Sequence, residues 1–74
     1  MKTITVSQKL EGRLLVGLVC KRIDGSKYTS RLFLPELVHA IVPYTPLTGP
    51  QCLKVITGSR QFYYLDHDDE VEIA

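Results

Sequence analysis

The sequence lacks a long hydrophobic run. Its longest apolar stretch, from Leu14 to Cys20, covers seven residues, whereas a helix that crosses a bilayer needs about 20. The first residues also lack the apolar segment of a secretory signal peptide. These two absences predict a cytoplasmic protein with no membrane partner.

Cysteine is also scarce. The sequence has two, Cys20 and Cys52, whereas a secreted domain of this size usually carries a larger set of paired cysteines. Both lie in apolar runs, where a free thiol behaves as a small hydrophobic side chain. There is no C-x-x-C or H-x-x-x-H spacing that would suggest a zinc site. We therefore expect two buried free thiols, no metal site and no cofactor.

The motifs of the common enzyme classes are missing. The sequence contains no G-x-S-x-G elbow, no P-loop and no G-x-G-x-x-G. Its serines have no recognisable base beside them, and a hydroxyl without a positioned base is inert. His39 is expected as a surface or half-buried residue of a helix rather than as a general base. We predict no catalytic residue and a protein that is not an enzyme.

What the sequence does have is a strong separation of charge. Residues 1–65 hold all nine Lys and Arg residues and three acids, whereas residues 66–74 hold five acids and no Lys or Arg. This layout predicts an acidic C-terminal tail over 66–74. Three interpretations stay open: a solvated chain end, a segment that neutralises a basic face, or a segment that docks on a basic partner.

Alternating polar and apolar residues predict several short strands. A central strand is expected over 13–23, with Gly17 at a bend. The Asp24-Gly25 pair predicts a tight hairpin turn, and Gly58-Ser59 predicts a second two-residue turn. The other expected strands cover residues 2–7, 26–33, 52–57 and 60–65, with 71–73 as a last edge strand.

One segment favours a helix instead. Pro35 suits a first helical turn and Glu36 complements the helix dipole, while Pro43 would end the element. We therefore predict a single small domain over 1–74 that is mainly β (small α+β). Its five or six short strands would form a strongly bent antiparallel sheet or an SH3-like partly open barrel, with one short helix near 35–42. The alternative is a flat sheet with the helix across one face.

The candidate binding residues come from the charge separation and from tyrosines interleaved with cations. Tyrosine and arginine are enriched at protein interfaces, and basic faces with aromatics also stack bases and follow phosphates. The Pro- and Gly-rich loop over 44–51 is a further place where binding is expected. The predicted partner-binding residues are Lys27, Arg31, Tyr44, Arg60, Tyr63, Asp66, Asp68, Asp69 and Glu70.

From residue 22 onward the chain resembles the small FlbD-like flagellar proteins. The resemblance is carried by R-I-D-G-S-K-Y at 22–28, L-F-L-P-E-L-V-H-A-I at 32–41 and L-K-V-I-T-G-S-R-Q-F-Y-Y-L at 53–65. It is a resemblance of pattern and implies no site residue. By size and charge layout the chain is also similar to small phage-encoded regulators that bind host RNA polymerase.

Three functions follow as expectations. The first is a protein-binding regulator of the transcription machinery, with RNA polymerase as the partner. The second is a nucleic-acid-binding module that uses Lys21 together with Lys27, Arg31, Arg60 and Tyr63. The third is a structural or assembly subunit whose edge strands pair with copies of itself.

Overall fold

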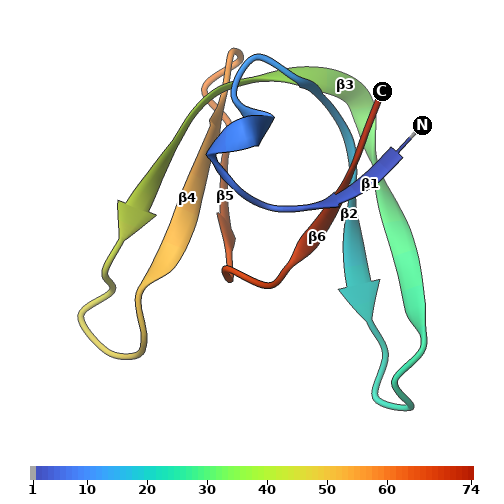
Figure 1. Cartoon of the computed structure of the whole chain (residues 1–74), viewed down its shortest axis with the longest axis vertical. Helices are drawn as coiled ribbons and strands as arrows, with labels where there is room; N and C mark the ends of the chain where they lie inside the picture. Colours follow the sequence, from blue (N-terminus) through green and yellow to red (C-terminus); the bar gives the residue numbers. More distant parts are fainter. Residues whose placement is uncertain (1) are drawn as a thin grey trace.

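In the computed structural model, which describes residues 2–74, six strands form one antiparallel sheet in the order β1-β6-β2-β3-β4-β5 (Figure 1). The sheet is strongly bent and is not closed, so the prediction of a mainly β fold is confirmed. The one helical element of the described residues is a short 3-10 turn, and no helix in that range is long and apolar enough to cross a membrane. The elements are β1 (Lys2–Thr5), η1 (Gln8–Leu10), β2 (Leu14–Lys21), β3 (Lys27–Tyr44), β4 (Cys52–Thr57), β5 (Phe62–Leu65) and β6 (Glu70–Ile73).

The long strand β3 bends the sheet. Its first part pairs with β2 from Lys27 to Leu37, and its second part pairs with β4 from Val38 to Tyr44. Figure 1 shows β3 arching across the molecule from one hairpin to the other. The ladder with β2 is interrupted between Arg31 and Glu36, so the strand can turn there.

The short helix predicted near 35–42 is wrong, because this segment belongs to β3. Pro35 falls in the interrupted part of the ladder, where its missing N–H leaves no strand bond unmade. A second register shift lies between Val38 and Ala40. This bulge places both Val38 and Ile41 in the core, which reproduces the three-residue spacing of a helix inside a strand.

The acidic C-terminal segment is not a solvated chain end. Strand β6 lies between β1 and β2, so the edge position predicted for residues 71–73 is wrong. Val71 and Ile73 have no exposed surface, and the alternating Glu70 and Glu72 lie on the other face of the strand. A strand was correctly expected there, but its apolar face fills the centre of the domain.

The core draws on most parts of the chain. The 3-10 turn η1 contributes Leu10, which is fully buried, and Ser7 caps this turn by accepting a hydrogen bond from the Lys9 N–H at 3.2 Å. Glu11, which follows η1, accepts a hydrogen bond from the Ile41 N–H at 3.0 Å, on a stretch of β3 beyond its pairing with β2. The buried core residues are Val6, Leu10, Leu15, Val38, Ile41, Val55, Val71 and Ile73.

The turn between β4 and β5 is longer than predicted. Residues 58–60 form a three-residue turn, because the Thr57 N–H donates to Gln61 O at 3.0 Å. The residue in the left-handed region is Arg60, with φ of 66°. This is the usual conformation for the last position of such a turn, and glycine is the residue that adopts it without steric cost.

We expect Arg60→Gly to stabilise the protein. The left-handed conformation costs a residue with a Cβ about 1–2 kcal/mol. The added chain entropy of glycine offsets about 0.5–1 kcal/mol of this, so the gain in free energy of unfolding should be about 0.5–1 kcal/mol. Urea denaturation measures it. Arg60→Ala is the control, since it removes the charge but keeps the Cβ, and an equal gain in that variant would contradict the strain argument.

Candidate functional site

Three aromatic side chains, a lysine and a valine form an exposed cluster on the outer face of β3, β4 and β5. Strand alternation places Val55 in the core and Lys54 outside, and the register sets Lys54 opposite both Val42 and Tyr64. Phe62 and Tyr64 lie on the same outer face of β5. We call this surface, made of Val42, Tyr44, Lys54, Phe62 and Tyr64, the aromatic face.

The side chains of the aromatic face contact one another. The rings of Tyr44 and Tyr64 lie 4.8 Å apart, centroid to centroid, at a tilt of 52°. The Lys54 ammonium lies 4.3 Å from the centroid of Phe62 and 6.0 Å from that of Tyr64. At such distances the face of an aromatic ring attracts a cation. They hold the four side chains in one preorganised patch.

The aromatic face is open to solvent although it is mostly apolar. Phe62 and Tyr64 are each about half exposed, at 51% and 53%. Lys54 is the one charged residue among the five. Aromatic enrichment with few charges is the composition of the centre of a protein interface.

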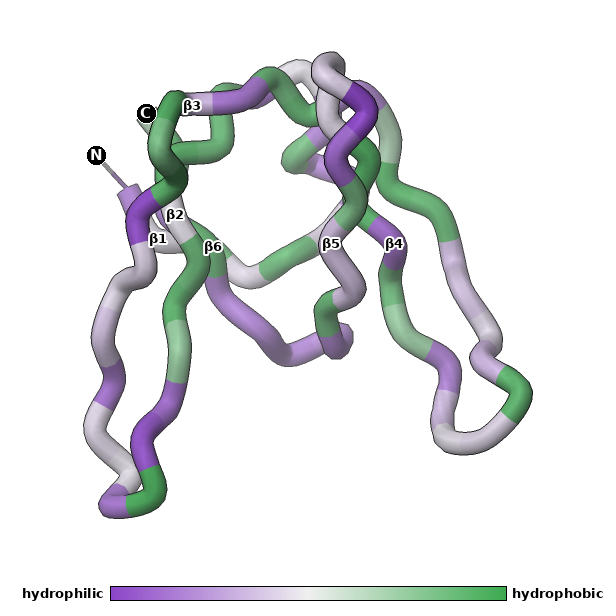
Figure 2. The backbone as a smooth tube through the Cα atoms, turned by 180° about the vertical axis from the view of Figure 1, so that it is seen from behind, coloured by the Kyte–Doolittle hydropathy of each residue, from purple (hydrophilic) through white to green (hydrophobic). Residues whose placement is uncertain are grey.

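Further apolar residues lie at the ends of the molecule. Figure 2 shows the β2–β3 and β3–β4 hairpins as two projections, each with a hydrophobic stretch near its tip. Ile23 and Leu47, at these two tips, are fully exposed, and so is Phe33 at the bend of β3. The β2–β3 hairpin carries a second cation–ring contact, with the Arg22 guanidinium 4.7 Å from the centroid of Tyr28.

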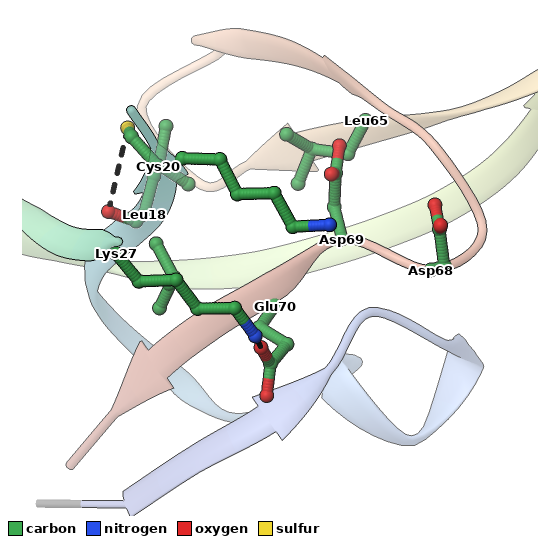
Figure 3. Close-up of a pocket in the computed structure, with 9 residues that line it drawn as sticks. Leu18, Cys20, Lys27, Leu65, Asp68, Asp69 and Glu70 are labelled. Carbon is green, nitrogen blue, oxygen red and sulfur yellow. Dashed lines mark hydrogen bonds and ion pairs between the residues drawn. The ribbon is translucent and has the colours of Figure 1, made fainter. Parts of the chain in front are cut away.

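The predicted cations Lys27 and Arg31 do not form an open basic surface. Lys27 Nζ lies 2.6 Å from Glu70 Oε1 (Figure 3), and Arg31 Nη2 lies 3.4 Å from Glu72 Oε1. This Glu72 oxygen is buried and accepts no hydrogen bond from the described residues, so the nearby guanidinium compensates its charge. At these two positions the acidic segment neutralises basic residues of the β2–β3 hairpin.

The predicted acidic residues Asp66, Asp68 and Asp69 lie together in the β5–β6 loop, with one carboxylate atom of each within 4.8 Å of the others. The Asp66 N–H donates to Asp69 Oδ2 at 2.8 Å, so Asp69 shapes this turn. The loop lines a hollow that also includes Leu18 and Lys27 (Figure 3). The Lys27–Glu70 ion pair lies at this hollow, and the Asp69 carboxylate binds the backbone of its own loop.

Tyr63 lies on the inner side of β5, opposite to the aromatic face. It is half-buried, and its hydroxyl donates to Glu36 Oε2 at 3.1 Å. Glu36 also accepts hydrogen bonds from the hydroxyls of Ser59 and Thr57. The Ser59 bond is the main cause that lowers the pKa of Glu36, and burial followed by the Glu36 contact raises the pKa of Tyr63. Tyr63 therefore ties β5 to β3.

Glu36 and the three hydroxyl groups that donate to it, those of Thr57, Ser59 and Tyr63, form the Glu36 cluster. This cluster predicts that the stability of the protein falls in acid. Because its pKa is lowered in the folded state, Glu36 stabilises the protein above its ordinary pKa of 4.5, and this contribution is lost as the pH falls through the folded-state value. We expect Glu36→Gln to be less stable at neutral pH and to lose less stability on acidification. Thermal unfolding from neutral pH to below pH 4.5 measures this difference. An unfolding temperature that changes with pH in the same way in both proteins would contradict the role given to Glu36.

The structure brings only part of the predicted set to one surface. Tyr44 belongs to the aromatic face, Arg60 lies in the β4–β5 turn, and the remaining predicted residues lie in ion pairs, in the β5–β6 loop or on the inner side. No family model, no curated protein and no solved structure matches this chain. The site therefore depends on the geometry alone.

The predicted partner-binding residues leave out Lys54, Phe62 and Tyr64, although Lys54 and Tyr64 belong to the interleaved cations and tyrosines. Alternation along β5 places Phe62 and Tyr64 on a common face. That pattern does not say which face of a strand is buried when both faces carry large apolar residues. Pairing with β4, which directs Val55 and Thr57 inward, decides it.

Proposed function

We propose that this chain is a non-enzymatic protein-binding module that contacts its partner through the aromatic face. The observation that carries the proposal is the exposed, mutually contacting set of Tyr44, Phe62 and Tyr64 around a single cation. Rigid aromatic side chains supply large contact area at low cost in conformational entropy. The exposed apolar tips of the two hairpins add surface of the same character.

The distribution of charge favours a protein partner over nucleic acid. Binding a phosphate backbone uses several cations that follow the strand. Here Lys27 and Arg31 contact Glu70 and Glu72, and the aromatic face offers only Lys54. The nucleic-acid alternative therefore keeps base stacking on the aromatic rings as its main support.

For the identity of the partner we propose the transcription machinery, in the cytoplasm. The support is the similarity in size and charge layout to small phage-encoded regulators that bind RNA polymerase. The two cysteines, Cys20 and Cys52, are both free thiols, as is usual for a reducing compartment. Bacterial RNA polymerase is the first purified partner to test.

The test compares capture of RNA polymerase, and of lysate proteins after nuclease treatment, by three forms of the chain. We expect the wild type to retain a partner and Tyr44→Ser to bind at least about tenfold more weakly, as for a central aromatic contact. Tyr28→Ser is the matched control, because Tyr28 has a similar exposure to Tyr44 but lies on the other hairpin, where it contacts Arg22.

Two outcomes would contradict the proposal. Equal losses in Tyr44→Ser and Tyr28→Ser would mean that the aromatic face is not the specific surface. Recovery that disappears with nuclease, together with retardation of single-stranded DNA or RNA that weakens steeply with salt, would favour the nucleic-acid alternative.

A further inference from the structure

The edge strand β5 lacks the usual protection against pairing with another strand. The outermost strands of the sheet are β1 and β5. β1 carries Lys2, a charged residue that discourages edge pairing, whereas β5 reads Phe-Tyr-Tyr-Leu, with no charge and no proline. Its pairing with β4 shows no bulge. An unprotected edge of this kind is a template for an added strand.

The backbone of β5 fixes which groups face the open edge. The Gln61 carbonyl accepts the Thr57 N–H of β4, so Gln61 directs its backbone oxygen toward β4. Successive residues of an antiparallel ladder alternate in this direction. Phe62 and Tyr64 therefore direct their N–H and C=O groups toward the open edge, and Tyr63 does not.

We propose that a second copy of this chain pairs with β5 through its own β5, antiparallel, about a two-fold axis at Tyr63. Residues that face the edge must meet residues that do the same, so the axis passes through a residue rather than between two. With the axis at Tyr63, Phe62 pairs with Tyr64 of the second copy, and Tyr64 pairs with its Phe62. These two pairs provide four backbone hydrogen bonds and two aromatic cross-strand contacts.

Charge complementarity selects this register. The axis at Tyr63 places Arg60 opposite Asp66 of the second copy, and symmetry produces this pair twice. An axis at Phe62 would set Arg60 opposite Tyr64, and an axis at Tyr64 would set Phe62 opposite Asp66. Only the axis at Tyr63 matches opposite charges at both ends of the pairing while keeping aromatic residues together in its centre.

The pairing also joins two surfaces that are open in one copy. The two aromatic faces would continue across the new pair of strands, since Phe62 and Tyr64 lie on the outer side of both copies. On the inner side, a hollow beside Gln61 and Tyr63 is lined by Phe33, which is 98% exposed. This inference stands independently of the proposed partner, because the pairing forms along the backbone edge of β5, whereas the partner would contact the outer face of β3, β4 and β5.

A cysteine cross-link tests the register in the full chain with Cys20→Ser and Cys52→Ser. Tyr63 would lie about 4.5 Å from Tyr63 of the second copy, Cα to Cα, which suits a disulfide. Gln61 would lie about 13 Å from Gln61 of the second copy, which is too far for a disulfide. We expect mild oxidation to link Tyr63→Cys into a dimer and to leave Gln61→Cys monomeric. Equal linkage at both positions would overturn the register.

A charge swap tests the same pairing without touching the Glu36 cluster. Sedimentation equilibrium of the wild type should show a mass that rises with concentration to that of a dimer. Arg60→Asp alone and Asp66→Arg alone should each weaken dimerisation by about tenfold, since two attractive pairs become repulsive. The double variant should return to within about threefold of the wild type.

Circular dichroism confirms that each of these variants is folded. A wild type that stays monomeric at all concentrations overturns the proposal, and so does a double variant as weak as the single ones. Either result leaves the partner-capture experiment on Tyr44 unaffected, so the two proposals fail separately.

Discussion

A chain that ends at Leu65 is expected to be unfolded. The truncation removes β6, which lies between β1 and β2 and contributes the fully buried Val71 and Ile73. Each buried aliphatic side chain contributes about 1.5–3 kcal/mol, and β1 would also lose β6, the strand with which it pairs. A domain of this size has a total stability of about 4–11 kcal/mol. Circular dichroism and the dispersion of amide proton chemical shifts in NMR spectra measure the loss of folded structure.

The control for this truncation keeps the chain length and removes charge. Asp66→Asn with Asp68→Asn changes two exposed carboxylates of the β5–β6 loop and is expected to remain folded. A truncated chain with native-like spectra would show that the acidic segment is dispensable, as a solvated tail would be. An unfolded charge variant would show that the loop charges, not the β6 strand, support the fold.

The second large effect is expected at Gly17. This residue is buried in β2 between β3 and β6, where it pairs with Arg31 and Glu72. A Cβ at this position would lie 2.9 Å from the Ser30 carbonyl oxygen and 2.9 Å from Thr29 Cγ2. Because β2 pairs with both β3 and β6 at Gly17, its backbone cannot move away from β3 without disturbing the pairing with β6. We expect Gly17→Ala to lower the free energy of unfolding by about 1–3 kcal/mol.

Gly58→Ala is the matched control for Gly17→Ala. Its added Cβ would lie 3.8 Å from the Leu37 carbonyl oxygen, which is an ordinary contact. Urea denaturation of both variants should show a clear loss for Gly17 and almost no change for Gly58. Equal midpoints would contradict the close approach of β2 and β3 at Gly17.

The failed helix prediction shows that a β-bulge, formed by strand pairing, can produce the residue spacing of a helix. Pro35 and Glu36 are a normal helix start, and Val38 and Ile41 have helical spacing. In the structure, the register shift at His39 creates that spacing in a strand, and pairing with β2 and then β4 outweighs the local preference of the segment. No property of residues 35–42 alone distinguishes these two possibilities.

The alternation of the strands, a hairpin turn at Asp24-Gly25 and the separation of acidic from basic residues follow from the sequence, because these are local properties. The turn itself is longer than predicted and spans residues 23–25, because the Arg22 N–H donates to Ser26 O at 2.8 Å. The pairing of the strands places β6 between β1 and β2, brings Glu70 and Glu72 to Lys27 and Arg31, and turns Phe62 and Tyr64 to solvent. Strand order and the choice of the buried face depend on pairings between residues far apart in the chain. Such pairings leave little trace in local sequence.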